Sequence, residues 1–372
     1  MSGDGMRARA AELLALAGVG LDGAQPWDIR VRDERLFARV LAQGSLGLGE
    51  SYMDGWWDCE RLDEFFTRIL AAELDTKVEP WRDTWRMLGA RLVNLQRRSR
   101  AFQIGQRHYD IGNDLFARML DRRMIYSCGY WKDATTLDEA QEAKLELVCR
   151  KLGLVAGMRV LDIGCGWGGT AKFAAERYGV SVVGATVSAE QARHARQLCA
   201  GLDVEILLED YRSLRGSFDR VLSIGMFEHV GVKNYPTFMR VVRERLAPGG
   251  LFLLHTIGGN RSQHRNDPWT ERYIFTNSML PSARQIAAAT EGVFVLEDWH
   301  GFGPDYDRTL MAWHANFERA WPELAGRYDE RFHRMWRYFL LSSAGGFRAR
   351  KTQLWQLVLS PGGVAGGYRA PR

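Results

Sequence analysis

Strands and helices alternate between residues 159 and 256, and this order constrains the fold of the chain more than any other feature. The strand-like apolar runs are Arg159–Ile163, Ser181–Val187, Val204–Leu208, Arg220–Ile224 and Leu251–Thr256, and the helical stretches between them are Thr170–Tyr178, Ala189–Leu198 and Tyr235–Leu246. Alternating units of this size form an open sheet of parallel strands with helices packed on it. We therefore expect an α/β fold with a doubly wound, Rossmann-like sheet.

The first hundred residues show helical periodicity and no strand alternation of any length. Apolar residues recur at helical spacing in three stretches, namely Leu36–Leu41, Leu62–Leu70 and Trp81–Leu95. The glycine-rich segment Gly44–Gly49 is expected to be a turn. Thr136 and Glu139 have the spacing of a capping box at the start of a further helix. We expect a small, mostly helical domain over residues 1–100 and a second domain over residues 101–372.

A glycine-rich segment directly follows the first predicted strand. The strand ends in Asp162, and Gly164, Gly166, Gly168 and Gly169 then open a helix. Glycines let the backbone approach a ligand closely, and open α/β sheets bind ligands at the carboxyl ends of their strands. An acid before the first glycine is not typical of dinucleotide-binding loops and suits a ligand with a positive amino group. The segment resembles motif I of the class I S-adenosylmethionine (SAM) methyltransferases.

The second strand departs from the usual pattern of those enzymes. They carry an acid at its end for the ribose hydroxyls, whereas this chain continues as Ala185–Ser188 without one. The ribose contacts must then come from elsewhere, such as Ser188 or Gln191. Asp210 and Tyr211 follow the third strand and are placed to meet the adenine, although Tyr211 as a plain packing residue is a fair alternative.

Further motifs make the resemblance more specific. They are Tyr126–Trp131, Gly225–Gly231, Leu253–Gly258 and Phe302–Asp307, together with Gly44–Trp57 and Arg107–Asp114. With these segments the chain resembles the family of cyclopropane fatty acid synthases and mycolic acid cyclopropane synthases. The likeness runs from about Leu36 to the C-terminal end. It implies a class I SAM-methyltransferase domain and a homodimer.

The resemblance also implies a reaction and its site. Family members transfer a methyl group from SAM to a cis double bond of a phospholipid acyl chain; a carbocation forms, a proton leaves the new methyl group, and the ring closes. A bound bicarbonate ion accepts the proton. Its implied ligands here are Cys128, Glu228, His255, Ile257 (through the backbone) and Tyr306. The implied SAM-binding residues are Tyr126, Ser127, Asp162, Gly164, Gly166, Gly168, Ser188, Gln191, Asp210 and Tyr211.

The residue types in these motifs suit that chemistry. A carbocation is stabilised by ring faces and carboxylates in a dry site, which Glu228, Tyr306 and Trp131 can supply. A small anion needs hydrogen-bond donors, and His255 provides one. His229, beside Glu228, is the alternative histidine; we favour His255 from its motif.

No covalent thiol is expected to take part. Cys128 is expected to be a polar wall of the anion site, and Cys149 and Cys165 to be packing residues. Some family members carry a cysteine in the segment that here runs Leu341–Gly345, where Ser343 takes its place. Serine is a far weaker nucleophile than cysteine at pH 7. The five cysteines lack CxxC spacing, which argues against a zinc site or a disulfide framework and fits a reducing cytosol.

Composition bears mainly on where the enzyme meets its substrate. No apolar stretch is long enough for a spanning helix of about 20 residues, and no signal peptide opens the chain, so we expect a cytoplasmic protein. An enzyme of bilayer phospholipids must then dock peripherally on the inner membrane surface. The excess of Lys and Arg over Asp and Glu, 50 to 45, suits an anionic surface.

Two features of the N-terminal domain are candidates for lipid contact. One is the apolar stripe of Leu62, Phe65, Phe66 and Ile69, and the other is the basic cluster of residues 97, 98 and 100. The alternative is that the stripe packs internally and the arginines are merely solvated.

Three other functions compete with this one. A relative of the same fold can methylate a small amine, or add a methyl branch to an acyl chain. A basic pI near 9.0 also suits a protein that binds or modifies nucleic acid, but the chain lacks an RNA-binding module and an NPPY-type tetrapeptide, so no nucleic-acid partner is expected. A non-enzymatic lipid-binding protein would need a vestigial SAM loop, whereas Asp162 and the glycines are intact.

Overall fold

The computed structural model describes residues 3–77 and 112–372. Grouped by their contacts, the residues form two units, which are described separately. The first comprises Met1–Val93, Arg265–Thr276 and Tyr306–Thr352, and the second comprises Asn94–His264, Asn277–Asp305 and Gln353–Arg372. Two later segments, expected within residues 101–372, thus pack with the N-terminal residues. The expected helix 81–95, the arginines at 97, 98 and 100, and the motif residues 107–111 lie outside the described residues.

A sheet of seven strands organises the second unit, in the order β5-β4-β3-β6-β7-β9-β8. Its strands are β3 (Arg159–Ile163), β4 (Ser181–Thr186), β5 (Val204–Leu208), β6 (Phe218–Ile224), β7 (Leu246–Gly259), β8 (Val295–Gly301) and β9 (Thr352–Ser360). Strands β3 to β7 pair in parallel, which confirms the expected arrangement of the five apolar runs.

Strand β9 was not predicted, and it changes the far edge of the sheet. It lies between β7 and β8 and runs antiparallel to β8. Nearly every residue of β9 from Gln353 to Ser360 is buried. A strand that is buried on both faces has no apolar–polar alternation to reveal it in the sequence.

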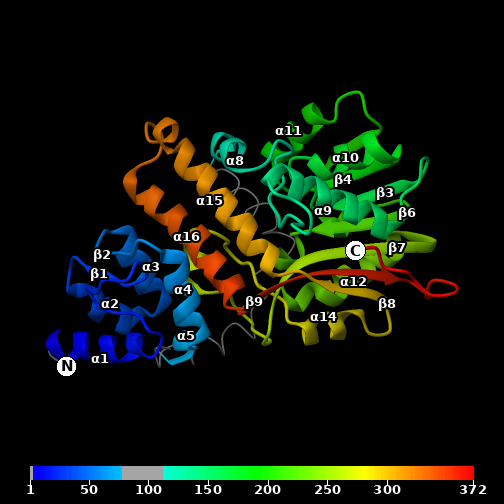
Figure 1. Cartoon of the computed structure of the whole chain (residues 1–372). Coiled ribbons are helices and arrows are strands. Elements are labelled where there is room, and N and C mark those ends of the chain that lie inside the picture. The colour runs from blue at the N-terminus through cyan, green and yellow to red at the C-terminus, as the bar shows by residue number, and fades with distance from the viewer. Residues whose placement is uncertain (1–2, 78–111) are drawn as a thin grey trace. The chain divides into compact units, whose positions relative to one another are not determined.

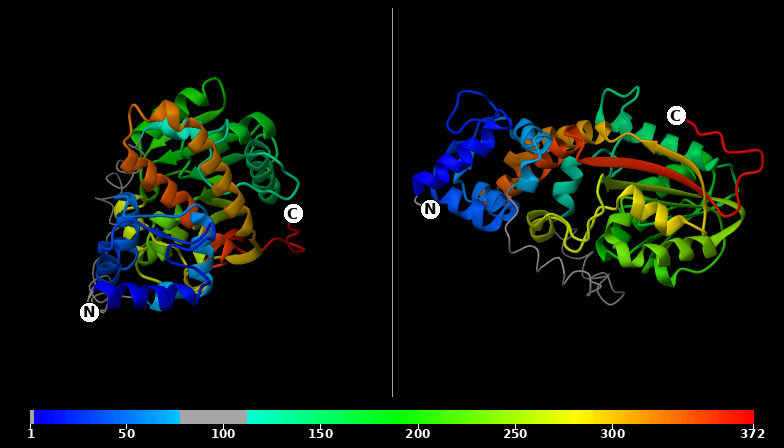
Figure 2. Two further views of the ribbon diagram at one scale, coloured as in Figure 1. Left: turned by 60° about the vertical axis from the view of Figure 1, so that its left-hand side comes forward. Right: turned by 90° about the horizontal axis from the view of Figure 1, so that it is seen from below.

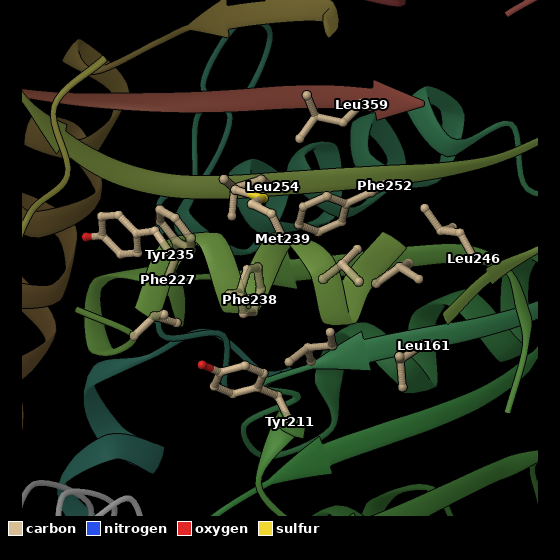
Figure 3. Close-up of a cluster of buried hydrophobic side chains, with 14 of the residues drawn as sticks. Leu161, Tyr211, Phe227, Tyr235, Phe238, Met239, Leu246, Phe252, Leu254 and Leu359 are labelled. Carbon is tan, nitrogen blue, oxygen red and sulfur yellow. The ribbon is translucent and has the colours of Figure 1, made fainter. Parts of the chain in front are cut away.

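Helices cover both faces of this sheet (Figure 1) (Figure 2). The helices of the unit are α8 (Asn113–Met119), α9 (Leu137–Leu152), α10 (Gly169–Tyr178), α11 (Ala189–Leu198), α12 (Tyr235–Arg245) and α14 (Ala283–Thr290). On one face, Phe238 and Met239 of α12 pack with Leu161 and Leu254 (Figure 3). On the other face, α9 and α10 pack with the neighbouring strand residues, such as Val160. Each large apolar side chain buried in this way contributes about 1.5–3 kcal/mol.

Helix α9 begins as its sequence predicts. The Thr136 hydroxyl accepts a hydrogen bond from the Glu139 N–H at 3.2 Å, and the Glu139 carboxylate accepts one from the Thr136 N–H at 3.0 Å. This capping box satisfies two N–H groups at the helix start. The helix ends at Gly153, which adopts the left-handed conformation with φ +57°.

The first unit is mostly helical, as expected. Its helices are α1 (Gly3–Ala15), α2 (Arg35–Gln43), α3 (Ser45–Met53), α4 (Leu62–Ala71), α5 (Leu74–Lys77), α13 (Pro268–Tyr273), α15 (Pro304–Leu324, which starts in the second unit) and α16 (Glu330–Arg348). A short antiparallel pair, β1 (Arg30–Val31) and β2 (Trp57–Asp58), accompanies them. Two-residue strands are too short to give an alternation pattern.

The prediction of a turn at Gly44–Gly49 is wrong, because Ser45–Met53 form helix α3. The glycines serve close packing instead. A Cβ on Gly47 would lie 2.5 Å from the Arg39 carbonyl oxygen, and one on Gly49 would lie 2.3 Å from a ring carbon of Trp269. Packing of the helix outweighs the roughly 1 kcal/mol that each helical glycine costs relative to alanine.

Three of the four residues of the α4 stripe, Leu62, Phe65 and Phe66, are buried within the first unit, and Ile69 is half-buried, which favours the alternative that the stripe packs internally. The Phe66 ring lies edge-on against Tyr338 of α16, with 5.1 Å between centroids. Gly345 of α16 permits this approach, because a Cβ there would lie 2.6 Å from the Phe66 Cβ. No helix among the described residues has the length and apolarity needed to cross a membrane.

Candidate active site

The polar motif residues of the second unit gather at one edge of its sheet. Asp162 is the next-to-last residue of β3, Asp210 follows β5, Glu228 follows β6 and His255 lies near the end of β7. Because these strands are parallel, their carboxyl ends lie at the same edge. That edge is where open α/β sheets bind their ligands.

The loop after β3 requires its glycines. Gly164, Gly166 and Gly168 have φ of +89°, +55° and +89°, a region that other residues rarely adopt. A Cβ on Gly164 would lie 2.7 Å from the Met226 Cβ, and one on Gly168 would lie 2.9 Å from the Ala195 Cβ. The side-chain-free backbone of this turn is thus held against its neighbours and can also lie close to a ligand.

Asp162 is the clearest mark of a ligand site. Its side chain is 1% exposed, and neither carboxylate oxygen has a hydrogen-bond partner among the described residues. Burial raises the pKa of this carboxyl to about 7, and the positive charge of Lys144 opposes the rise. A buried carboxylate without donors is costly. The ammonium group of the SAM methionine would supply donors and charge, so the site fits SAM.

Ser188 and Gln191 form a local network at the start of α11. The Ser188 hydroxyl caps the helix by accepting the Gln191 N–H at 3.3 Å. The Thr186 hydroxyl donates to Gln191 Oε1 at 3.0 Å. This network orients the Gln191 carboxamide through its Oε1 atom.

Asp210 and Tyr211 have different surroundings after β5. The Asp210 carboxylate accepts the Arg212 N–H at 3.0 Å and pairs with its guanidinium at 3.2 Å. The Tyr211 ring is buried and lies edge-on to Phe238 at 5.2 Å, within the core cluster of Figure 3. Tyr211 therefore does serve as a core packing residue.

The segment that carries Tyr126, Ser127 and Cys128 precedes α9 and packs against it. The Tyr126 ring packs edge-on against Phe116 at 5.1 Å. The Ser127 carbonyl oxygen accepts from the Gln141 carboxamide at 2.8 Å. Cys128 is fully buried, and its thiol donates to the Gly129 carbonyl oxygen at 3.1 Å. Because the thiol hydrogen is already donated to this carbonyl, Cys128 is better suited to line a site than to act as a nucleophile.

Glu228 and Ile257 interact directly. Glu228 Oε1 accepts the Ile257 N–H at 2.7 Å, while Oε2 is buried without a partner among the described residues. Burial raises the pKa of the Glu228 carboxyl to about 7. Since the Ile257 N–H is already used, only the carbonyl of Ile257 can serve an added ligand. That carbonyl already accepts from the Thr256 hydroxyl at 3.0 Å, which leaves it a second lone pair.

His255 is held by a residue that the sequence did not single out. The Gln356 carboxamide nitrogen, on β9, lies 3.2 Å from His255 Nδ1. Burial lowers the pKa of His255 well below its usual value, so the ring is neutral. With Gln356 donating to Nδ1, the ring proton is on Nε2, which has no partner in the described part of the chain. An Nε2–H donor and the Glu228 Oε2 acceptor fit a small oxyanion with one O–H, such as bicarbonate.

The alternative histidine, His229, is also neutral. Burial lowers its pKa to about 4.

Tyr306, the last of the expected anion ligands, belongs to the first unit. Its ring packs there against Phe347 at 4.6 Å and Trp313 at 5.9 Å between ring centroids. The residue before it, Asp305, accepts the Trp131 N–H at 2.7 Å within the second unit.

Lys144 and Gln356 are the site neighbours that sequence reasoning missed. Gln356 is hidden because β9 itself was not predicted. Lys144 could have been noticed in the sequence, because it lies in the apolar stripe of α9 beside Leu145, where a charged residue is unexpected.

Cys149 and Cys165 are buried, and burial raises the pKa of both thiols, so neither is a ready nucleophile.

Comparison with known proteins narrows the chemistry of this site. The family model "Mycolic acid cyclopropane synthetase" matches residues 96–357. The cyclopropane-fatty-acyl-phospholipid synthase of Escherichia coli (strain K12) is 58% identical over 364 residues, which cover 98% of this chain and 95% of the relative.

Two further proteins show the range of the likeness. The tuberculostearic acid methyltransferase UfaA1 of Mycobacterium tuberculosis is 34% identical over 357 residues, covering 88% of this chain and 82% of the relative. The crystal structure of mycolic acid cyclopropane synthase CmaA1 complexed with SAH (S-adenosylhomocysteine) and CTAB matches with a TM-score of 0.64 and 34% identity. It covers 69% of this chain and 97% of that one.

Proposed function

Because the chain belongs to the mycolic acid cyclopropane synthetase family, we propose that it transfers a methylene group from SAM to the cis double bond of unsaturated phospholipid acyl chains, forming a cyclopropane ring. The observation that carries the proposal is the 58% identity with the Escherichia coli synthase over 98% of the chain. The buried carboxylates of Asp162 and Glu228 supply the matching chemistry, because both oxygens of Asp162 and the Oε2 atom of Glu228 lack a hydrogen-bond partner among the described residues.

The residues have separate roles in this proposal. Asp162 binds the ammonium group of SAM, the backbone of Gly164–Gly168 lies along its methionine part, and Gln191 binds the ribose. An alkene is a weak nucleophile, so accurate placement of the sulfonium against it lowers the barrier by several kcal/mol. Glu228 supplies negative charge near the carbocation, and burial keeps water from quenching it.

A proton must leave the new methyl group before the ring closes. Bicarbonate, when bound, supplies the oxygen base for this proton. The neutral Nε2–H of His255 would donate to it, and its single O–H would donate to Glu228 Oε2 or to the Ile257 carbonyl oxygen. Cys128 would form a wall of the same site, and Tyr306 is proposed as a ligand on its motif alone.

Product analysis tests the reaction directly. The purified protein is incubated with SAM and vesicles of an unsaturated phospholipid, and the fatty esters are analysed by mass and for alkene content. Ring formation adds one CH2 group and removes the alkene without a reductant. Unchanged fatty esters in the presence of bound SAM would contradict the proposal.

A methyl-branching reaction is the second candidate, favoured by the likeness to the tuberculostearic acid methyltransferase. A saturated branch takes up two more hydrogen atoms than a cyclopropane and needs a reductant, so the same analysis separates the two. The identity of 34% to that relative, against 58% to the cyclopropane synthase, makes the ring the better proposal.

We expect no loss of turnover when Ser343 is replaced by alanine. Ser343 lies half-buried on α16 in the first unit, and a serine hydroxyl without a strong base is a poor nucleophile at pH 7. The measurement is turnover with vesicles, with SAM affinity and thermal unfolding as controls. Abolished turnover in a folded, SAM-binding Ser343→Ala variant would show that this position is catalytic after all.

The enzyme is proposed to act as a cytoplasmic homodimer that docks peripherally on the inner membrane surface. Because Leu62, Phe65 and Phe66 of the α4 stripe are buried, the basic cluster at residues 97, 98 and 100 is the better candidate for lipid contact. Each basic residue near an anionic surface contributes about 1 kcal/mol. A variant with all three arginines changed to glutamate should therefore lose most of its cosedimentation with anionic liposomes. Binding equal to that of the wild type would rule out this cluster.

A further inference from the structure

Two lysines on α9 are fully buried, but their partners differ. Lys151 has an acid, because its Nζ lies 3.1 Å from Asp298 Oδ2. Lys144 has none within the described residues; its one hydrogen bond is to the Ser127 hydroxyl oxygen, at 3.0 Å. Burial of an ammonium group without an ion pair is costly and rare. A cost of this kind points to a role for Lys144 beyond packing.

We propose that Lys144 is a positioning residue for the methionine end of SAM: it orients the Ser127 hydroxyl and places a positive charge behind Asp162. The inference rests on the proposed function, since it assigns to α9 a part in binding the co-substrate. Lys144 does not touch the reacting atoms and acts through Ser127 and Asp162.

The first part of the argument is the orientation of Ser127. A hydroxyl group has one donor and two acceptor positions. The Lys144 N–H occupies an acceptor position of Ser127 Oγ, and the Gln141 carboxamide holds the Ser127 carbonyl at 2.8 Å. The Ser127 proton is then left to donate to a carboxylate, such as that of the SAM methionine.

The same helix holds the rest of the segment. The Tyr130 N–H donates to the Ala140 carbonyl oxygen at 2.8 Å. A Cβ on Gly129 would lie 2.9 Å from the Ala140 Cβ, so the segment packs directly on the helix. Gln141 and Lys144 are both fully buried in this packing. Contacts with α9, through both backbone and side chains, therefore fix the position of Ser127.

The second part of the argument is charge. Lys144 is the one charged group that opposes the rise in the pKa of Asp162, whose carboxylate has no hydrogen bond among the described residues. The groups that face Lys144 in turn are Asp121, Cys128, Asp162 and Cys149, and Lys144 also faces His255. The Asp121 carboxylate accepts the N–H groups of Arg123 and Ile125 at 3.0 and 2.8 Å. Of the two acids in this group, Asp162 is thus the one whose carboxylate accepts no hydrogen bond among the described residues.

The test compares Lys144→Met with Lys151→Met. Both replace a fully buried ammonium on the same helix with a neutral chain of similar length. Asp298 keeps Arg372 as a partner at 2.9 Å in the second variant. The affinity for SAH, which carries the same ammonium and carboxylate groups as SAM, is measured by calorimetry between pH 6 and 9, with thermal unfolding as the folding control.

We expect Lys144→Met to bind SAH severalfold more weakly near neutral pH, because Asp162 then loses the positive charge that opposes its protonation. The deficit should shrink toward pH 9, because Asp162 then ionises without help, and a residual loss from Ser127 should remain. Lys151→Met should bind as the wild type. Wild-type affinity of Lys144→Met at every pH, or an equal loss in both variants, would overturn the proposal.

Ser127→Ala provides a second route if Lys144→Met does not fold. It keeps the lysine and removes its partner, so SAH affinity should fall severalfold without a shift of the pH profile; unchanged affinity would overturn the part of the proposal that concerns Ser127. The wild type separates this inference from the proposed function. Failure of the wild type to bind SAH or to alter phospholipid esters counts against the function, whereas a wild type that does both beside an unaffected Lys144→Met counts against the inference alone.

Discussion

Replacement of Glu228 by glutamine should lower turnover by about 10²–10³-fold, the usual cost of removing one group aimed at developing charge. Glutamine keeps the Oε1 atom that accepts the Ile257 N–H at 2.7 Å, so the local backbone should stay in place. It replaces the unpartnered Oε2 by a neutral NH2 group and so removes negative charge beside the carbocation. The measurement is turnover with phospholipid vesicles, alongside SAH affinity, which should change little.

The pH profile gives a second readout for Glu228. Burial raises the pKa of its carboxyl to about 7, so the carboxylate form is lost as pH falls through 7. Wild-type turnover at saturating SAM should therefore decline on the acid side, and the residual turnover of Glu228→Gln under the same conditions should lack that decline. Because a buried charge is removed, the variant should unfold at a higher temperature than the wild type at pH 8. Turnover within threefold of the wild type would exclude Glu228 from the chemistry.

Replacement of Asp162 by asparagine should weaken SAH binding about a hundredfold or more, since truncating one partner of a buried, charged hydrogen bond costs about 2–5 kcal/mol. The side chain is buried, and both of its oxygens lack partners among the described residues, so both are available to accept hydrogen bonds from the ammonium. Calorimetric titration with SAH checks this directly, without lipid.

The wild-type affinity for SAH should also fall as pH decreases. Burial raises the pKa of the Asp162 carboxyl to about 7, so below that value the ligand has to compete with a proton. In Asp162→Asn this dependence should disappear, while thermal stability at pH 8 is kept or increased. An Asp162→Asn variant that binds SAH as tightly as the wild type would show that the ammonium is bound elsewhere.

The sequence determined most of the second unit. Strands β3 and β5 and helix α11 have the predicted bounds, and the Thr136 capping box forms as its spacing indicates. These elements are local: period, caps and glycines act within a few residues and are visible in the chain itself. The parallel pairing of these strands then brings Asp162, Glu228 and His255 to one edge of the sheet.

The tertiary structure decided the features that depend on residues far apart in sequence. Helix α3 forms through a glycine-rich segment because Trp269 packs where the side chain of Gly49 would be. Phe66 of the α4 stripe is buried because Tyr338 of α16 packs on it.

Contacts between residues far apart in sequence also decide the surroundings of the site. Gln356 meets His255 from 101 residues away on an unpredicted strand, and Lys144 meets Ser127 from the buried face of a helix. Periodicity shows which face of a segment is apolar, but it does not show which partner covers that face or where a buried charge finds its counterpart. Those choices are made by long-range packing, because the free energy of a buried group depends on the neighbours that the whole fold brings to it.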